Sequence, residues 1–98
     1  MAVQVTPLYA ACNFGLYEVV KLLIEKGAHV NHINHGYGED WGPLHVAIYH
    51  KHKDVIALLV QNNADLNYKE KYGRTPLDLA KQVNASEEII QWLNGSTQ

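Results

Sequence analysis

Histidine gathers in one short stretch of this 98-residue chain, "HVNHINHGYGEDWGPLH" at residues 29–45, which holds four of the six histidines and two acidic residues. Imidazole and carboxylate groups are common zinc ligands, but a zinc site needs three or four of them to converge on one point. His29, His32 and His35 are spaced by three, whereas residues on one face of a strand are spaced by two. A metal-binding function is therefore only a distant third hypothesis, and we predict no cofactor and no metal site.

Other arrangements that support catalysis do not occur in the sequence. It has no phosphate-binding glycine loop and no G-x-S-x-G motif. The lone cysteine, Cys12, falls in a predicted helix where a buried, unreactive thiol is expected. One cysteine cannot form an internal disulfide, which fits a reducing compartment. We therefore expect an intracellular protein that is not an enzyme.

Composition sets the broad class. The chain is 47% apolar and 18% charged, which is ordinary for a folded protein, and its length suits a single domain over residues 1–98. The net charge is -2 with neutral histidines, and no run of basic residues occurs. Because nucleic-acid binding depends on Lys and Arg neutralising phosphates, we expect no nucleic-acid partner. The N-terminus has neither a basic start nor a long apolar run, so we expect no signal peptide and no membrane partner.

A six-residue motif recurs along the chain and organises it into units. The motif reads TPLYAA at 6–11, GPLHVA at 42–47 and TPLDLA at 75–80, so its spacings are 36 and 33 residues. After each motif come a short polar turn and an apolar run. Thr6 and Thr75 are good helix N-caps, and a proline at the next position suits the first residue of a helix. Gly42 has no hydroxyl to offer, so we expect a weaker start there.

The apolar runs predict a second helix in each unit. Their apolar residues recur at helical spacing, and Gly27 and Asn63 follow the first two runs, where a helix commonly ends in a left-handed turn. The residues predicted to face the core are Val19, Leu22, Leu23 and Ile24 in the first unit, Val55, Leu58 and Leu59 in the second, and Ile89, Trp92 and Leu93 in the third.

With its period near 33 residues and a six-residue motif similar to the T-P-L-H-x-A of ankyrin repeats, the chain resembles the ankyrin-repeat family. The resemblance implies an all-α solenoid of three stacked helix–turn–helix units joined by β-hairpin or finger loops, because such units cannot bury their apolar faces alone. We place repeat 1 at about 6–33, repeat 2 at about 34–66 with an extended finger at 32–41, and repeat 3 at about 67–94 as the C-terminal cap. His45 and His52 occupy positions that the resemblance assigns to the scaffold.

Family geometry also implies where a partner would bind. The finger tips and first helices of an ankyrin array form a concave surface, and we predict that a protein or peptide binds there without chemistry. Trp41 is the predicted anchor, because Trp, Tyr and Arg are enriched among interface hot spots. The alternative is an architectural spacer in a longer array that binds nothing. The predicted contact residues are Asn13, Phe14, Ile33, His35, Tyr37, Trp41, Tyr49, His50, Lys69, Lys71, Tyr72 and Arg74.

Two further expectations concern the ends of the units. Repeat 3 is polar, as a terminal cap should be, whereas repeat 1 looks like an interior repeat, so we expect further repeats or self-association at its N-terminal face. Asn31 and Asn67 close their units in a turn-forming role. The resemblance implies a second possibility, hydroxylation by intracellular asparaginyl hydroxylases, and Asp65 favours Asn67 over Asn31.

Overall fold

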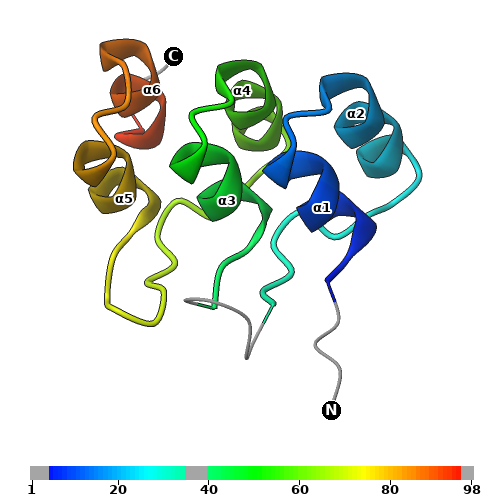
Figure 1. The fold of residues 1–98 in the computed structure, drawn as a ribbon, viewed down its shortest axis with the longest axis horizontal. Coiled ribbons are helices and arrows are strands. Elements are labelled where there is room, and N and C mark those ends of the chain that lie inside the picture. The colour runs from blue at the N-terminus through cyan, green and yellow to red at the C-terminus, as the bar shows by residue number, and fades with distance from the viewer. Residues whose placement is uncertain (1–4, 35–39, 96–98) are drawn as a thin grey trace.

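The computed structural model describes residues 5–34 and 40–95, and these residues form three helix pairs standing side by side (Figure 1). The first helices touch one another in the order α1, α3, α5, and the second helices in the order α2, α4, α6, so the molecule has two layers. No described residue lies in a strand. The all-α repeat fold predicted from the sequence is confirmed. The helices are α1 (Pro7–Asn13), α2 (Tyr17–Glu25), α3 (Pro43–Tyr49), α4 (Lys53–Gln61), α5 (Pro76–Gln82) and α6 (Glu87–Leu93).

The first helix of each pair begins as its motif predicts. Thr6 Oγ1 accepts from the backbone N–H of Tyr9 at 3.1 Å. Thr75 and Asp78 cap each other reciprocally, with N···O distances of 3.2 and 3.1 Å. At Gly42, which has no side chain to offer, the ring of His45 reaches back and its Nδ1 accepts from the Gly42 N–H at 3.2 Å. The histidine of the motif thus partly replaces the missing cap.

Turns between helices use left-handed residues. Gly27 and Asn63 have φ values of 94° and 69°, as predicted for the ends of the second helices. Gly15 turns the chain between α1 and α2, and a Cβ there would lie 2.6 Å from Nδ1 of His52. The His52 ring fills this space, and its Nε2 donates to the carbonyl oxygen of Asn13 at 3.1 Å. His52 therefore joins the turns of repeats 1 and 2, the scaffold role that the resemblance implied.

Apolar side chains from both layers form one continuous core through the three pairs. Cys12 is fully buried in it, and burial raises the pKa of its thiol to about 12, so the group is unreactive at neutral pH. The stripe predicted for repeat 1 is partly wrong, because Val19 and Leu22 are exposed on α2. Their counterparts in α4, Val55 and Leu58, are buried because repeat 1 packs ahead of them.

The loops between units run away from the helices as fingers (Figure 1). Residues 69–74 form the finger of repeat 3. Glu70 N–H donates to Arg74 O at 3.0 Å and Gly73 N–H donates to Glu70 O at 2.8 Å, so this finger ends in a tight turn. In the preceding finger, Asn34 N–H donates to the carbonyl oxygen of Trp41 at 3.0 Å. These are hairpin-type bonds without a strand in the described parts of either finger. No helix within residues 5–34 and 40–95 is long and apolar enough to cross a bilayer.

Candidate functional site

Trp41 lies in the core, so the prediction of an exposed anchor is wrong. Its side chain is 8% exposed, and its indole N–H donates to Glu70 Oε2 at 3.1 Å. The ring stacks with that of His45 at a centroid distance of 6.5 Å and packs against Tyr49 at 5.3 Å. The sequence places Trp41 at the end of a finger, which suggested that it is exposed. In the structure the Glu70 carboxylate accepts a hydrogen bond from its indole N–H, and the ring packs against α3.

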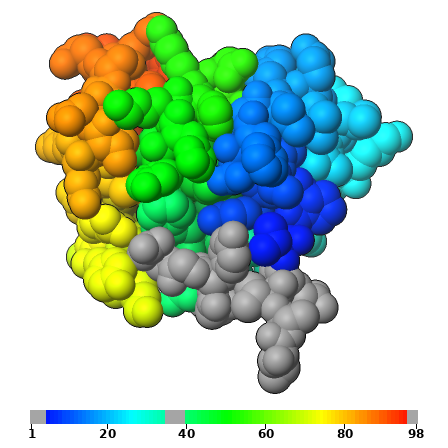
Figure 2. Space-filling view, viewed as in Figure 1, coloured from blue at the N-terminus to red at the C-terminus, as the bar shows by residue number. Residues whose placement is uncertain are grey.

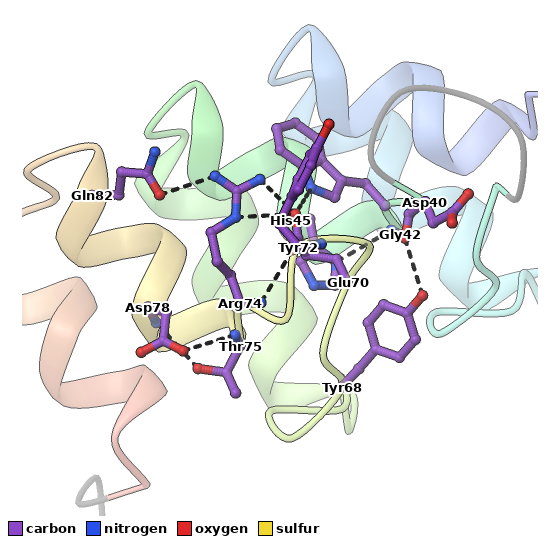
Figure 3. A network of polar contacts seen from close by, with 11 residues as sticks. Asp40, Gly42, His45, Tyr68, Glu70, Tyr72, Arg74, Thr75, Asp78 and Gln82 are labelled. Atoms are coloured by element: carbon purple, nitrogen blue, oxygen red, sulfur yellow. Dashed lines mark hydrogen bonds and ion pairs between the residues drawn. The ribbon is translucent and has the colours of Figure 1, made fainter.

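Glu70 is the centre of this arrangement (Figure 3). Its buried carboxylate accepts from Trp41, from Arg74 Nε at 3.1 Å and Nη2 at 2.5 Å, and from the backbone N–H groups of Tyr72 at 2.7 Å and Arg74 at 3.1 Å. Burial alone would raise the pKa of Glu70, but the hydrogen bonds from Arg74, Trp41 and the two backbone groups lower it to about 2. The carboxylate is therefore charged at neutral pH and fixes the finger of repeat 3 in place.

Arg74 connects the buried Glu70 carboxylate to exposed residues. Its Nη1 donates to Gln82 Oε1 at 2.9 Å, which joins the finger to α5 (Figure 3). The ring of Tyr72 lies 5.4 Å from the guanidinium carbon of Arg74 and 5.8 Å from Nζ of Lys71, both within the range of cation–π attraction. Tyr72 is nevertheless 65% exposed. An aromatic ring is thus presented to solvent from a turn that a buried ion pair holds rigid.

A hollow of about 280 Å³ opens beside this network, between α3 and α5. Tyr49, which is 51% exposed, and Trp41 form its aromatic wall. The volume is below the range of about 300–1,000 Å³ that pockets for small molecules usually have, so the hollow suits one side chain of a larger partner. Its lining residues are Trp41, Tyr49, Arg74, Leu79, Gln82 and Val83.

A second group of predicted contact residues lies at the C-terminal ends of α1 and α3. His50 Nε2 and Asn13 Oδ1 are 3.0 Å apart, which connects repeats 1 and 2. The ring of His50 also packs edge-on against Tyr49 at a centroid distance of 5.1 Å. Phe14 is exposed at the end of α1. His50 contacts Tyr49 and Asn13 contacts His50, so the predicted surface continues from the hollow to the C-terminal ends of α3 and α1.

Other predicted contact residues do not join the hollow. Ile33 is half-buried and, with Val30, lines a small groove against α3. Lys69 is exposed on the finger of repeat 3 outside the hollow. His35 and Tyr37 lie outside the described residues. The sequence analysis did not identify Glu70 as a functional residue. The sequence feature that could have indicated its ion pair is its position four residues before Arg74, across the turn at Tyr72 and Gly73.

The two asparagines that close the units are placed differently. Asn31 bridges to the next repeat: its Nδ2 donates to Asn63 O at 3.1 Å, and its Oδ1 accepts from the Asp65 N–H at 2.7 Å. Asn67 donates its backbone N–H to Asp65 Oδ1 at 2.9 Å, and its side chain is exposed. The Asn31 amide therefore ties two units together.

His45, from the histidine-rich stretch, is buried under the finger of repeat 3. Burial, partly opposed by the Glu70 carboxylate, lowers the pKa of His45 to about 4, so the ring is neutral at physiological pH. Because Nδ1 accepts from Gly42, the proton belongs on Nε2. Within the part of the chain that the structure describes, no three His, Cys, Asp or Glu side chains are grouped to hold a metal ion.

Comparison with known proteins identifies the repeat. The family model for ankyrin repeats in three copies matches residues 8–97. The chain is 36% identical over 97 residues to mouse Rabankyrin-5, 33% over 89 residues to the fem-1 homolog C of Xenopus laevis, and 43% over 85 residues to mouse ankyrin repeat and SOCS box protein 11. These alignments cover 95, 91 and 87% of the chain but only 8, 14 and 25% of the relatives.

Proposed function

The chain belongs to the ankyrin-repeat family, and we propose on that basis that it binds a protein or peptide on its concave surface. Ankyrin repeats are in general protein–protein interaction modules rather than enzymes. The proposed surface comprises the hollow between α3 and α5, the finger of repeat 3, and the adjoining ends of α1 and α3. An intracellular setting is part of the proposal, because the sequence has a single cysteine, which cannot form an internal disulfide.

One observation carries this proposal: exposed Tyr49 and Tyr72 stand on a support that a buried network makes rigid. Trp41 and Arg74 both donate hydrogen bonds to the Glu70 carboxylate, so we expect the surface to be formed before a partner arrives. A preformed surface loses little conformational entropy on binding, and exposed tyrosines beside a hollow are typical of interface hot spots. Trp41 is then the floor of the site rather than its anchor.

Charge suggests what the partner presents. The charge of Glu70 is buried and compensated by Arg74, whereas Lys69 and Lys71 are exposed on the same finger. We therefore expect a segment with one apolar or aromatic side chain for the hollow and an acidic group near the two lysines. Such a partner would be attracted more strongly at low ionic strength.

Affinity capture with matched variants tests the proposal. Wild type, Tyr49→Ser with Tyr72→Ser, and Gln61→Ser with Lys21→Ser would serve as baits, because Gln61 and Lys21 are exposed on the second helices. We expect at least one protein that wild type and the second-helix variant retain and the tyrosine variant loses. If all three baits retain the same proteins in equal amounts, the concave surface is not the binding site.

The second candidate is an architectural spacer, with no partner of its own. The observation that favours it is the small share of each relative that the chain spans. It predicts that no captured protein distinguishes the tyrosine variant from wild type. Histidine-based metal binding is a third candidate that no described contact favours.

We also propose that, if the chain is hydroxylated on asparagine, Asn67 is modified before Asn31. Asn31 and Asn67 are both exposed, but both polar atoms of the Asn31 amide bond to repeat 2, which holds that side chain in place. Incubation with an asparaginyl hydroxylase and peptide mass spectrometry would test this. We expect the mass of one added oxygen on Asn67, and the same gain on Asn31 alone would contradict the assignment.

A further inference from the structure

The hollow between α3 and α5 has an aromatic side and an aliphatic side. Repeats 2 and 3 lie side by side (Figure 2), and the hollow takes Trp41 and Tyr49 from repeat 2 and Leu79 and Val83 from repeat 3. The Tyr49 ring contacts those of Trp41 and His50 at centroid distances of 5.3 and 5.1 Å, so two neighbours set its orientation. An aromatic ring bound here would gain more than its buried area alone, because neighbouring rings attract one another.

The polar end of the hollow presents a hydrogen-bond donor of known orientation. Arg74 Nη1 donates to Gln82 Oε1 at 2.9 Å (Figure 3), and a guanidinium can only donate, so the oxygen of the Gln82 amide must face Arg74. The nitrogen, Nε2, is then the other end of the amide. In the part of the chain that the structure describes, this nitrogen donates to no other group, and the Gln82 side chain is exposed. Its N–H groups are therefore available to an oxygen of a bound side chain.

The charges beside Gln82 narrow the choice of that side chain. The positive guanidinium of Arg74 also lines the hollow, so a lysine or arginine side chain would bring like charges together. A carboxylate is poorly matched as well, because Arg74 is already ion-paired with the Glu70 carboxylate. The neutral phenol of tyrosine combines a ring for the apolar sides with an oxygen that can accept from an amide N–H.

We propose that Gln82 is the specificity-determining residue of the hollow and that the side chain it selects is a tyrosine of the partner. This inference rests on the proposed function, since it presumes a partner on the concave surface. The ring of that tyrosine lies against Trp41 and Tyr49, and its hydroxyl oxygen accepts from Gln82 Nε2. A phenylalanine would fill the same space but would leave the amide donor to water, so Gln82 discriminates between the two.

Titration with single amino-acid derivatives tests this inference without knowledge of the partner. The probes are the N-acetyl amides of tyrosine, phenylalanine and glutamate, added to the isotope-labelled 98-residue chain while the NMR signals of Tyr49, Val83 and the Gln82 side-chain amide are recorded. We expect the tyrosine probe to shift these signals and to bind about two- to tenfold more tightly than the phenylalanine probe, the usual gain from one hydrogen bond exposed to water. Equal affinities of these two probes, or tightest binding of the glutamate probe, would overturn the proposal.

Matched substitutions assign the preference to one side chain. Gln82→Leu should remove the difference between the tyrosine and phenylalanine probes and leave the affinity for the phenylalanine probe unchanged. Gln61→Leu, at an exposed position on α4, should keep the difference. A tyrosine preference that survives in Gln82→Leu, or an equal loss of affinity for both probes in that variant, would overturn the assignment.

The titration and the affinity capture can fail separately. If the Tyr49→Ser, Tyr72→Ser bait loses a protein that wild type retains, while the tyrosine and phenylalanine probes bind wild type equally, the concave surface stands and the role of Gln82 is refuted. If the probes discriminate as expected and no captured protein distinguishes the baits, the selectivity of the hollow is supported and the proposed binding of a partner there is refuted.

Discussion

Glu70 shows how a single buried residue can organise the surface that we propose for binding without itself being exposed on it. A buried carboxylate is costly unless its hydrogen bonds are made, and here both side-chain and backbone donors meet it. The same bonds orient Arg74 and enclose Trp41. We attribute the order of the finger of repeat 3 to this one group, because its partners lie both within that finger, at Tyr72 and Arg74, and in the preceding loop, at Trp41.

Substitution of Trp41 tests the network at the level of stability. Trp41→Ala removes a buried ring and should lower the free energy of unfolding by about 3–5 kcal/mol. Trp41→Phe keeps an aromatic ring but removes one donor to Glu70, and should cost about 1–3 kcal/mol. Urea denaturation would measure both. Tyr72→Ala is the control, within about 0.5 kcal/mol of wild type because the ring is exposed. A Trp41→Ala effect as small as that of the control would contradict the burial of Trp41.

Acid should weaken the fold through His45. The pKa of His45 is lowered from 6.5 to about 4, so between pH 6.5 and about 4 this side chain is protonated in the unfolded state but not in the folded state. Stability therefore falls as the pH drops through this window, by on the order of 1–3 kcal/mol. The lowered pKa of Glu70 adds a loss of the same sign between 4.5 and about 2.

Urea midpoints at pH 7.5 and 5.0 would measure the first of these two losses. We expect His45→Gln to reduce the difference between the midpoints, whereas Gln61→Ser, which changes an exposed residue with no ionisable group, should leave it unchanged. Equal midpoints at both pH values in the wild type would show that His45 is protonated as readily in the folded protein as in the unfolded chain.

At the scale of helices, α2 and α4 share one apolar pattern, but their apolar faces are buried to different extents. The motif at each unit predicted the helix starts, and Thr6 and Thr75 cap as expected. Burial could not be predicted in the same way, because periodicity identifies an apolar face but not whether another element covers it. Val19 and Leu22 carry the same pattern as Val55 and Leu58 and are nevertheless exposed.

Leucine-to-alanine changes at matched positions would measure this difference. Leu58→Ala should cost about 2–5 kcal/mol, since it leaves a cavity between repeats. Leu22→Ala should cost less than about 0.5 kcal/mol in the same chain, because the residue is exposed. Thermal or urea unfolding of the two variants is sufficient. Similar losses would mean that α2 is covered in the isolated chain.

For the whole molecule, the fold could be predicted from three in-phase motifs, since each unit repeats one local solution and stacking follows from the apolar faces that the units share. The arrangement of the residues in the proposed binding surface could be predicted only in part. Tyr49 and Tyr72 are exposed as expected, but the place of Trp41 depends on Glu70, a contact between residues 29 positions apart. A contact of that kind between two loops leaves no periodic signal in the sequence.

Hydrogen–deuterium exchange of the chain with a captured partner would test the proposed binding surface most directly. We expect slower exchange on binding at residues 49–50, in the finger at 69–74, and near Gln82, with little change in α2, α4 and α6. Protection confined to those second helices, with the finger of repeat 3 unchanged, would contradict the account.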